Sequence, residues 1–193
     1  MFETMRKEEM NLELRRKLFH SLFGLVLILI LFCFERKILI LFLSLLLLFG
    51  SIMIVWRLRG NRIPIADWFE ETFERKNVRF PGYGAFWYVV GTLLLALFIS
   101  NANEITAAIL TLSLGDSAAT IFGIRGMHPL PYNRRKTIEG SFAFLIFSLP
   151  SCLLVEWVGI PLALLAAVAE SLPVPIDDNL LIPITAVLFF III

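Results

Sequence analysis

A carboxylate inside an apolar run is the feature of this sequence best suited to chemistry. Residues 115–140 read GDSAATIFGIRGMHPLPYNRRKTIEG, where Asp116 is followed by glycines and by the basic cluster Arg134, Arg135 and Lys136. A charge at membrane depth costs at least about 2.5 kcal/mol, so its presence predicts a functional site. An acid, glycines and clustered bases in one short span are typical of a site that handles phosphate and a metal ion.

The sequence leaves two chemical roles open for Asp116. The carboxylate could hold Mg²⁺ against phosphate oxygens, because Mg²⁺ commonly binds one or two carboxylates together with substrate phosphates. It could instead act as the general base for an attacking hydroxyl. On a helix, Asp116, Ala119 and Gly123 lie on one face, whereas Gly115 and Gly123 could also serve close helix packing alone.

The segment that follows predicts an anion site. Thr137 is a candidate cap for a helix that starts near residue 138, and the free N–H groups of such a helix favour an anion. Lys136 adjoins this position and Glu139 lies in the first turn. The sequence GxxxxGK[ST] of a P-loop does not occur in the chain. His128, in a loop with Pro129 and Pro131, is interpreted as structural or solvent-facing.

Two further polar groups lie elsewhere in the chain. Arg16, Lys17 and His20 share a helical face and could bind a polyphosphate, although basic residues beside a first span also set topology and anchor to headgroups. Glu170 precedes SLPVPIDDN, in which Asp177 and Asp178 open a last helix with Asn179 as its expected cap. Asp177 and Asp178 could hold or position a metal ion, or serve only as partners of the helix dipole.

Composition predicts the setting for these groups. The 193 residues are 59% hydrophobic and 17% charged, which favours an all-α, polytopic membrane bundle in one domain covering residues 1–193. We expect six or seven spans, with the last two short, near 18–34, 38–56, 83–100, 105–122, 138–158, 161–172 and 180–193. Ser148, Pro150 and Ser151 should bend the fifth.

The segment IADWFEETFERK predicts an amphipathic interfacial helix with Asp67 as its cap and Trp68 near headgroup level. Anchoring is the simpler role for this helix, and a lid over a lipid entrance is the alternative.

Charge placement predicts the orientation. Fifteen of the seventeen Lys and Arg residues fall in the N-terminal segment and in the loops after spans two and four, and only Arg36 and Lys37 fall on the other side. By the positive-inside rule the N-terminus and all of the polar residue groups described above should face the cytoplasm.

The overall charge gives no indication of a nucleic-acid partner, because the formal net charge is only +1. Membrane lipids are the expected surroundings, and homodimer formation is left open. Cys33 and Cys152 lie in apolar runs and are expected to be buried small hydrophobic side chains and not part of a disulfide or a zinc site.

Four segments together resemble the CTP-dependent membrane lipid kinases, the family of dolichol kinase, phytol kinase and the CTP-dependent diacylglycerol kinase. These segments are RRKLFH (15–20), GDSAATIFGIRG (115–126), RRKTIEG (134–140) and ESLPVPIDDNLLIP (170–183). The resemblance implies phosphoryl transfer from CTP to the hydroxyl of a lipid alcohol, polyprenol-like, phytol-like or diacylglycerol, with Mg²⁺ or another divalent cation. Eukaryotic dolichol kinases are much longer, so this chain resembles only their C-terminal core.

The resulting site prediction has three parts. The catalytic candidates are Asp116, Lys136 and Glu139, and the metal candidates are Asp116, Asp177 and Asp178. The nucleotide-binding candidates are Arg16, Lys17, His20, Gly115, Ala119, Gly123, Gly126, Arg134, Arg135, Lys136, Thr137 and Gly140. The nearest alternative is a cytidylyltransferase that makes a CDP-lipid and releases pyrophosphate. A different class of alternative is a small ion-coupled transporter, although no inverted repeat is visible.

Overall fold

The fold is all-helical in the computed structural model, which describes residues 2–75 and 78–193 and side chains from Met10 onward. Lys76 and the side chains of Arg6 and Lys7, which entered the orientation argument, lie outside this part of the chain. No strand occurs among the described residues. The helices are α1 (Phe2–Leu58), α2 (Pro64–Phe73), α3 (Tyr83–Phe98), α4 (Ala102–Leu110), α5 (Asp116–Gly123), α6 (Ile138–Ser148), α7 (Cys152–Val155), α8 (Gly159–Ser171) and α9 (Asp178–Ile192).

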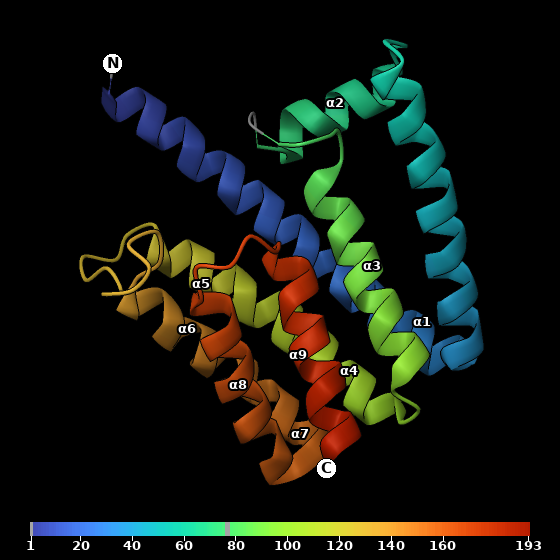
Figure 1. Ribbon diagram of the computed structural model, residues 1–193, viewed down its shortest axis with the longest axis vertical. Helices are drawn as coiled ribbons and strands as arrows, with labels where there is room; N and C mark the ends of the chain where they lie inside the picture. The colour runs from blue at the N-terminus through green and yellow to red at the C-terminus, as the bar shows by residue number, and fades with distance from the viewer. Residues whose placement is uncertain (1, 76–77) are drawn as a thin grey trace.

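Helix α1 consists of two arms joined by an elbow at Glu35. Glu35 has φ 71° and ψ 165°, which interrupts the helix where the sequence predicts the boundary between the first two spans. Figure 1 shows the second arm turning back at this elbow and diverging from the first. The Arg36 guanidinium donates from Nε to the Ala96 carbonyl over 2.8 Å, so the elbow is tied to the end of α3.

Two later stretches also agree with the predicted spans. Helices α4 and α5 form one rod, joined by a π-helical turn at Thr111–Gly115. Helices α6 and α8 form a hairpin, and the predicted bend is confirmed by the 3₁₀ turn Leu149–Ser151 around Pro150. The stretches long and apolar enough to cross a membrane are Met10–Leu58, Ala102–Gly123 and Ile138–Ser171; Tyr83–Phe98 and Asp178–Ile192 are shorter apolar helices.

Helix α2 is capped differently from the prediction. Asp67 lies inside the helix, which begins at Pro64 with Ile63 in the capping position and no side-chain cap. Proline suits a first helical position because its missing N–H has no partner there. Asp67 instead forms an ion pair with Arg57, which also donates to Glu70 over 2.7 Å. These pairs hold α2 against the end of α1, and Trp68 on it is exposed, as the prediction requires.

The buried core is formed by α1, α3, α4, α6, α8 and α9, and its largest members include Tyr88, Phe144, Leu27, Ile105 and Ile109. The predicted burial of both cysteines is wrong, because Cys33 is exposed on the outside of α1 and Cys152 is only half-buried. Many leucine, isoleucine and phenylalanine side chains remain exposed on the outside of the bundle, including Leu29, Leu48 and Ile191. Apolar surface on this scale is rare in soluble monomers and marks contact with lipid or protein. With the apolar helices, it indicates a membrane protein.

The polar links gather at one end of the bundle. In Figure 1 the links α2–α3, α5–α6 and α8–α9 lie on the side of the bundle where α1 starts, from the top of the view to its left edge. The elbow of α1, the α3–α4 link, α7 and the C-terminus lie at the opposite end. The helices therefore bring together residues that are more than 150 positions apart in the sequence.

Candidate functional site

The centre of the site is a buried ion pair between Lys17 of α1 and Asp116 at the start of α5. Both residues are almost completely buried, at 3% and 2% exposure. Two hydrogen bonds beside this pair join α1 to the α4–α5 rod. Ser117 Oγ donates to the Lys17 carbonyl over 3.2 Å, and Ser21 Oγ donates to the Ser113 carbonyl over 3.0 Å. The π-helical turn ends directly before Asp116, and such turns are frequent at functional sites.

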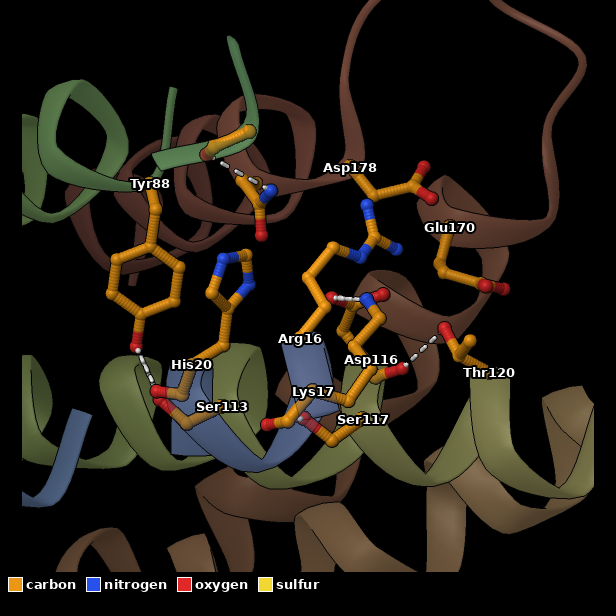
Figure 2. A network of polar contacts seen from close by, with 12 residues as sticks. Arg16, Lys17, His20, Tyr88, Ser113, Asp116, Ser117, Thr120, Glu170 and Asp178 are labelled. Atoms are coloured by element: carbon orange, nitrogen blue, oxygen red, sulfur yellow. Dashed lines mark hydrogen bonds and ion pairs between the residues drawn. The ribbon is translucent and has the colours of Figure 1, made fainter. Parts of the chain in front are cut away.

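Three carboxylates from three helices meet beside this pair. One oxygen each of Asp116, Glu170 and Asp178 can be chosen so that all lie within 4.8 Å of one another. Figure 2 shows the three groups in this part of the structure, with the Lys17 and Asp116 side chains in contact. Glu170 lies in the last turn of α8 and Asp178 is the first residue of α9, so the short α8–α9 link places both acids together.

Lys136, from the α5–α6 link, neutralises two of these acids. Its Nζ donates to Glu170 Oε1 over 2.5 Å and to Asp178 Oδ2 over 2.7 Å. Burial by itself lowers the pKa of Lys136, but the surrounding carboxylates, Asp178 first, raise that pKa above its ordinary value of 10.5. The ammonium group therefore stays charged at neutral pH.

Several buried polar atoms around the carboxylates have no protein partner. Within the described part of the chain these include Asp116 Oδ1, Arg16 Nε, His20 Nδ1 and Asn179 Oδ1. An unsatisfied buried polar group costs about 1–3 kcal/mol, so a native protein rarely keeps several together without a reason. A bound ligand or metal ion would satisfy them. A set of carboxylate oxygens with a free, buried Asp116 oxygen fits a hard cation such as Mg²⁺.

The carboxylates open into a polar cavity of about 920 Å³. Five helices (α1, α5, α6, α8 and α9) and the links α2–α3, α5–α6 and α8–α9 form its walls. Glu170, Asp177 and Asp178 line it together with basic side chains. The basic residues that line it are Arg16, Lys17, Arg75, Arg134, Arg135 and Lys136. Small residues leave room beside α5 and α6: Ala119, Gly123 and Gly140. A cavity of this size and charge is able to hold a nucleotide polyphosphate.

Sequence similarity connects the chain to an uncharacterized protein of the archaeon Methanocaldococcus jannaschii. The two are 31% identical over 177 residues, which cover 89% of this chain and 88% of the archaeal protein. The chain belongs to the family of this archaeal protein. It is also 28% identical over 211 aligned positions to a soybean (Glycine max) protein named "Probable phytol kinase 3, chloroplastic". That alignment covers 96% of this chain and 65% of the soybean protein. No family model and no solved structure matches the chain.

The structure brings most of the predicted nucleotide residues to the polar cavity. Those that line it are Arg16, Lys17, Ala119, Gly123, Arg134, Arg135, Lys136, Thr137 and Gly140. The predicted cap at Thr137 is confirmed, because its Oγ1 accepts from the Gly140 N–H over 3.2 Å. His20 lies deeper, and its backbone carbonyl accepts from the Tyr88 hydroxyl over 3.2 Å.

Three predicted residues have other contacts. Glu139 is turned toward the α5–α6 link, where its carboxylate accepts from the Met127 N–H over 3.0 Å and pairs with the exposed His128 ring. Gly126 packs against Thr137 and Glu139 in that link. Gly115 lies close to Ser148 and Phe144, so its role in the structure is close packing of α6 against the rod.

The predicted acids at the start of α9 divide into two roles. Asp177 lines the cavity, but its carboxylate accepts from the Asn179 N–H over 3.0 Å and caps α9. The prediction that Asn179 is the cap is therefore wrong: Asn179 lies in the first turn and donates from its amide to the Gly84 carbonyl over 3.3 Å.

Glu170 joins Asp116 and Asp178 in the carboxylate cluster, a position that the metal prediction gave to Asp177. The cost of a charge in an apolar run, which singled out Asp116, applies equally to Glu170 and is the signal that could have found it.

Other supporting residues have no local signal in the sequence. Glu13 accepts from Arg16 over 2.7 Å and from Arg75 over 2.5 Å, which fixes Arg16 at the cavity wall. The Tyr88 hydroxyl and Ser113 Oγ lie 2.6 Å apart and connect α3 to the turn before Asp116. Only the tertiary fold shows these supporting interactions, because most of them join different helices or links.

Proposed function

We propose that this chain is a membrane-embedded kinase that transfers the γ-phosphoryl group of CTP to the hydroxyl of a lipid alcohol. The observation that carries the proposal is the carboxylate cluster Asp116, Glu170 and Asp178, set in a basic cavity of about 920 Å³ within an apolar bundle. Phosphoryl transfer requires positioning and charge neutralisation more than covalent chemistry, and this site supplies both. The name of the soybean relative supports a kinase that acts on a lipid alcohol.

The proposal includes a membrane topology. The two arms of α1, the α4–α5 rod, the α6–α8 hairpin, α3 and α9 would form a multi-pass bundle with the N-terminus and the cavity on the cytoplasmic side. The distribution of Lys and Arg supports this orientation, because their predicted loops lie at the cavity end of the bundle. CTP would then reach the cavity from the cytoplasm.

The chain's own residues would bind and orient the nucleotide. Arg16, Arg134, Arg135 and Lys136 would neutralise the triphosphate, and the first N–H groups of α6 would donate to a phosphate oxygen. Asp116, Glu170 and Asp178 would hold Mg²⁺ or another divalent cation. Such an ion, when bound, supplies positive charge against the phosphate oxygens.

The reaction joins the alcohol oxygen to the γ-phosphorus and breaks the bond between that phosphorus and the bridging oxygen, so that CDP leaves. The alcohol proton must pass to a base. Asp116 is the candidate from this chain, and its two roles, metal ligand and base, are alternatives that kinetics can separate. Lys17 balances the Asp116 charge.

The decisive experiment incubates the purified full chain with CTP and each of a panel of lipid alcohols: a polyprenol, a phytol-like alcohol and diacylglycerol. We expect CDP and a lipid phosphate, with less product when ATP replaces CTP or when a chelator removes divalent cations. In a parallel incubation with CTP and the corresponding lipid phosphates, release of pyrophosphate with formation of a CDP-lipid would instead establish the cytidylyltransferase.

The transporter alternative receives less support. Its ionisable residues should mark a path across the bundle, whereas the carboxylate cluster and the cavity lie at one end. If Asp116→Asn abolished ion-coupled flux in liposomes and left nucleotide turnover unchanged in detergent, the transporter would replace the kinase.

A further inference from the structure

A second cavity, almost entirely apolar, lies between the two arms of α1 and beneath α2. It has a volume of about 390 Å³, within the range of about 300–1,000 Å³ typical of small-molecule sites. Figure 1 shows α2 extending from the end of the second α1 arm toward α3, which closes this space from one side. Its walls are formed by apolar side chains of the two arms, α2 and α3, such as Phe23, Leu46, Met53, Ile65 and Phe86. We name it the apolar groove.

A smaller cavity lies between the apolar groove and the proposed phosphoryl-transfer site and has residues in common with both. It has a volume of about 220 Å³ and shares Phe19, His20, Phe69, Gly82 and Ala85 with the groove. On its other side the same small cavity shares Arg16, Arg75 and Asp177 with the polar cavity. A molecule could therefore keep a hydrocarbon chain in the groove while its polar end reaches the charged residues.

His20 is the polar side chain at this junction. It is 5% exposed, it lines both the groove and the small cavity, and its Nδ1 has no partner in the described part of the chain. The ring packs beside Tyr88 with centroids 4.9 Å apart. A buried imidazole with a free ring nitrogen is well suited to bind a hydroxyl group.

The charges around the groove favour a neutral chain over a phospholipid. Its charged lining residues, Arg57 and Glu70, already pair with each other at 2.7 Å. The groove follows α1 from Leu46 to Arg57, a distance of about 16 Å along a helix. This suits an extended hydrocarbon chain that carries only a small polar group.

We propose that the apolar groove binds the hydrocarbon chain of the acceptor alcohol and that His20 positions the hydroxyl at the edge of the polar cavity. The inference rests on the proposed lipid-alcohol kinase and adds the location and the chemical class of its acceptor. It makes activity depend on chain length, since a short alcohol leaves most of the groove unfilled.

Gly50 offers a direct test, because a Cβ added there meets nothing within 4 Å while the residue itself lines the groove. Gly50→Trp should fill the groove with little displacement of its walls. The matched control is Leu48→Trp on the same arm, where the side chain is 55% exposed and outside the groove lining.

The probe is a long-chain isoprenoid alcohol with a diazirine near the end of its chain, photolysed with the full protein in phospholipid nanodiscs without nucleotide. We expect crosslinks at residues 46–57 and 85–89, displaced by excess unlabelled alcohol. Because the indole ring would occupy space needed by the hydrocarbon chain, labelling should fall about tenfold or more in Gly50→Trp. Labelling should change by less than about twofold in Leu48→Trp. Equal labelling of both variants, or labelling spread over the outer faces, would overturn the proposal.

Because the crosslink needs no turnover, the test is separable from the kinase assay. If Gly50→Trp abolishes labelling of the groove but the protein phosphorylates no alcohol, the kinase proposal is refuted. The groove would still be identified as a binding site for the alcohol chain. Where the kinase is active, His20→Leu should raise KM for the alcohol about tenfold, the effect of removing one hydrogen bond, with KM for CTP unchanged. A rise in KM for CTP alone would instead indicate that His20 belongs to the nucleotide site.

Discussion

At the scale of single residues, the unusual feature is that Asp116 is both buried and only half satisfied. Lys17 contacts Oδ2, whereas Oδ1 has no partner among the described residues. Two buried charges in contact do not by themselves add much stability, because desolvation offsets their attraction. A bound cation or phosphate would use the free oxygen, which makes a binding role for Asp116 a better explanation than a structural one.

Replacement of Asp116 by Asn tests this explanation. Asp116→Asn should lower kcat by about 10²–10³-fold, the effect of removing one electrostatic group from a preorganised site. Steady-state release of CDP in detergent measures it. The matched control is Glu104→Gln, in the first turn of α4 and outside the cavity lining, which should retain normal turnover.

Removal of the carboxylate also leaves the Lys17 charge buried and unpaired, which costs about 3–5 kcal/mol. Combining Asp116→Asn with Lys17→Met removes this penalty and should restore thermal stability without restoring turnover. Recovery of turnover in the double variant would contradict the proposed role of Asp116.

Lys136 should act mainly on the nucleotide. Because the substitution removes one charge-assisted hydrogen bond to the triphosphate, Lys136→Gln should raise KM for CTP by about 10–100-fold. Arg125→Gln, an exposed change outside the cavity lining, is the control. An unchanged KM in Lys136→Gln would remove this residue from the nucleotide site.

The pH profile gives an independent check on Lys136. The carboxylates around it raise the pKa of Lys136 above 10.5 despite the opposing effect of burial. A raised folded-state pKa contributes stability below the unfolded pKa and loses it only as pH rises through the folded value. Titration of Lys136 should therefore change neither the stability nor kcat/KM between about pH 6 and about pH 9. At higher pH, the dependence of kcat/KM on pH should be the same for the unmodified protein and for Arg125→Gln.

At the scale of helices, the approach of α6 to α5 shapes the cavity wall. A Cβ on Gly140 would lie 2.8 Å from the Ala119 carbonyl oxygen and 3.2 Å from the Gly123 Cα. Neither contact is with a flexible side chain, so the two helices would have to separate. The small residues that line the cavity are thus also those that let α5 and α6 pack closely.

A pair of glycine-to-alanine changes measures this packing. Gly140→Ala should destabilise the protein by about 1–3 kcal/mol through overpacking. Gly50→Ala, whose new methyl group meets nothing, should be neutral or stabilise α1 by up to about 1 kcal/mol through helix propensity. Thermal unfolding in detergent followed by circular dichroism compares the two. Equal midpoints would mean that α5 and α6 can separate freely.

At the scale of the whole molecule, the polar links define one face and the α1 elbow, α7 and the C-terminus define the other. This arrangement makes a prediction about topology. In a variant without Cys33 and Cys152, a cysteine at His128 should react with an impermeant maleimide only from the cytoplasmic side, and one at Asn101 only from the opposite side. Labelling of both from the same side would refute the proposed multi-pass orientation.

The helical architecture and most of the basic residues that line the polar cavity could be predicted from the sequence. Long apolar runs interrupted at Glu35–Lys37, Pro150 and Pro173 can satisfy their backbone groups only as helices that turn at those places. Asp116 was recognisable because a charge in such a run is costly, and Thr137 because a hydroxyl before an apolar run caps a helix.

Which polar groups meet depends on the packing of the helices and could not be predicted from the sequence. Asp177 and Asp178 are adjacent and chemically alike, but the backbone at the start of α9 directs one to its own helix as a cap and the other to Lys136. Glu139 turns to its own link, while Glu170 joins Asp116 and Asp178 in the cluster. The partner of each carboxylate depends on the rotation of its helix and on contacts between distant segments. The order of residue types along the chain does not contain that information.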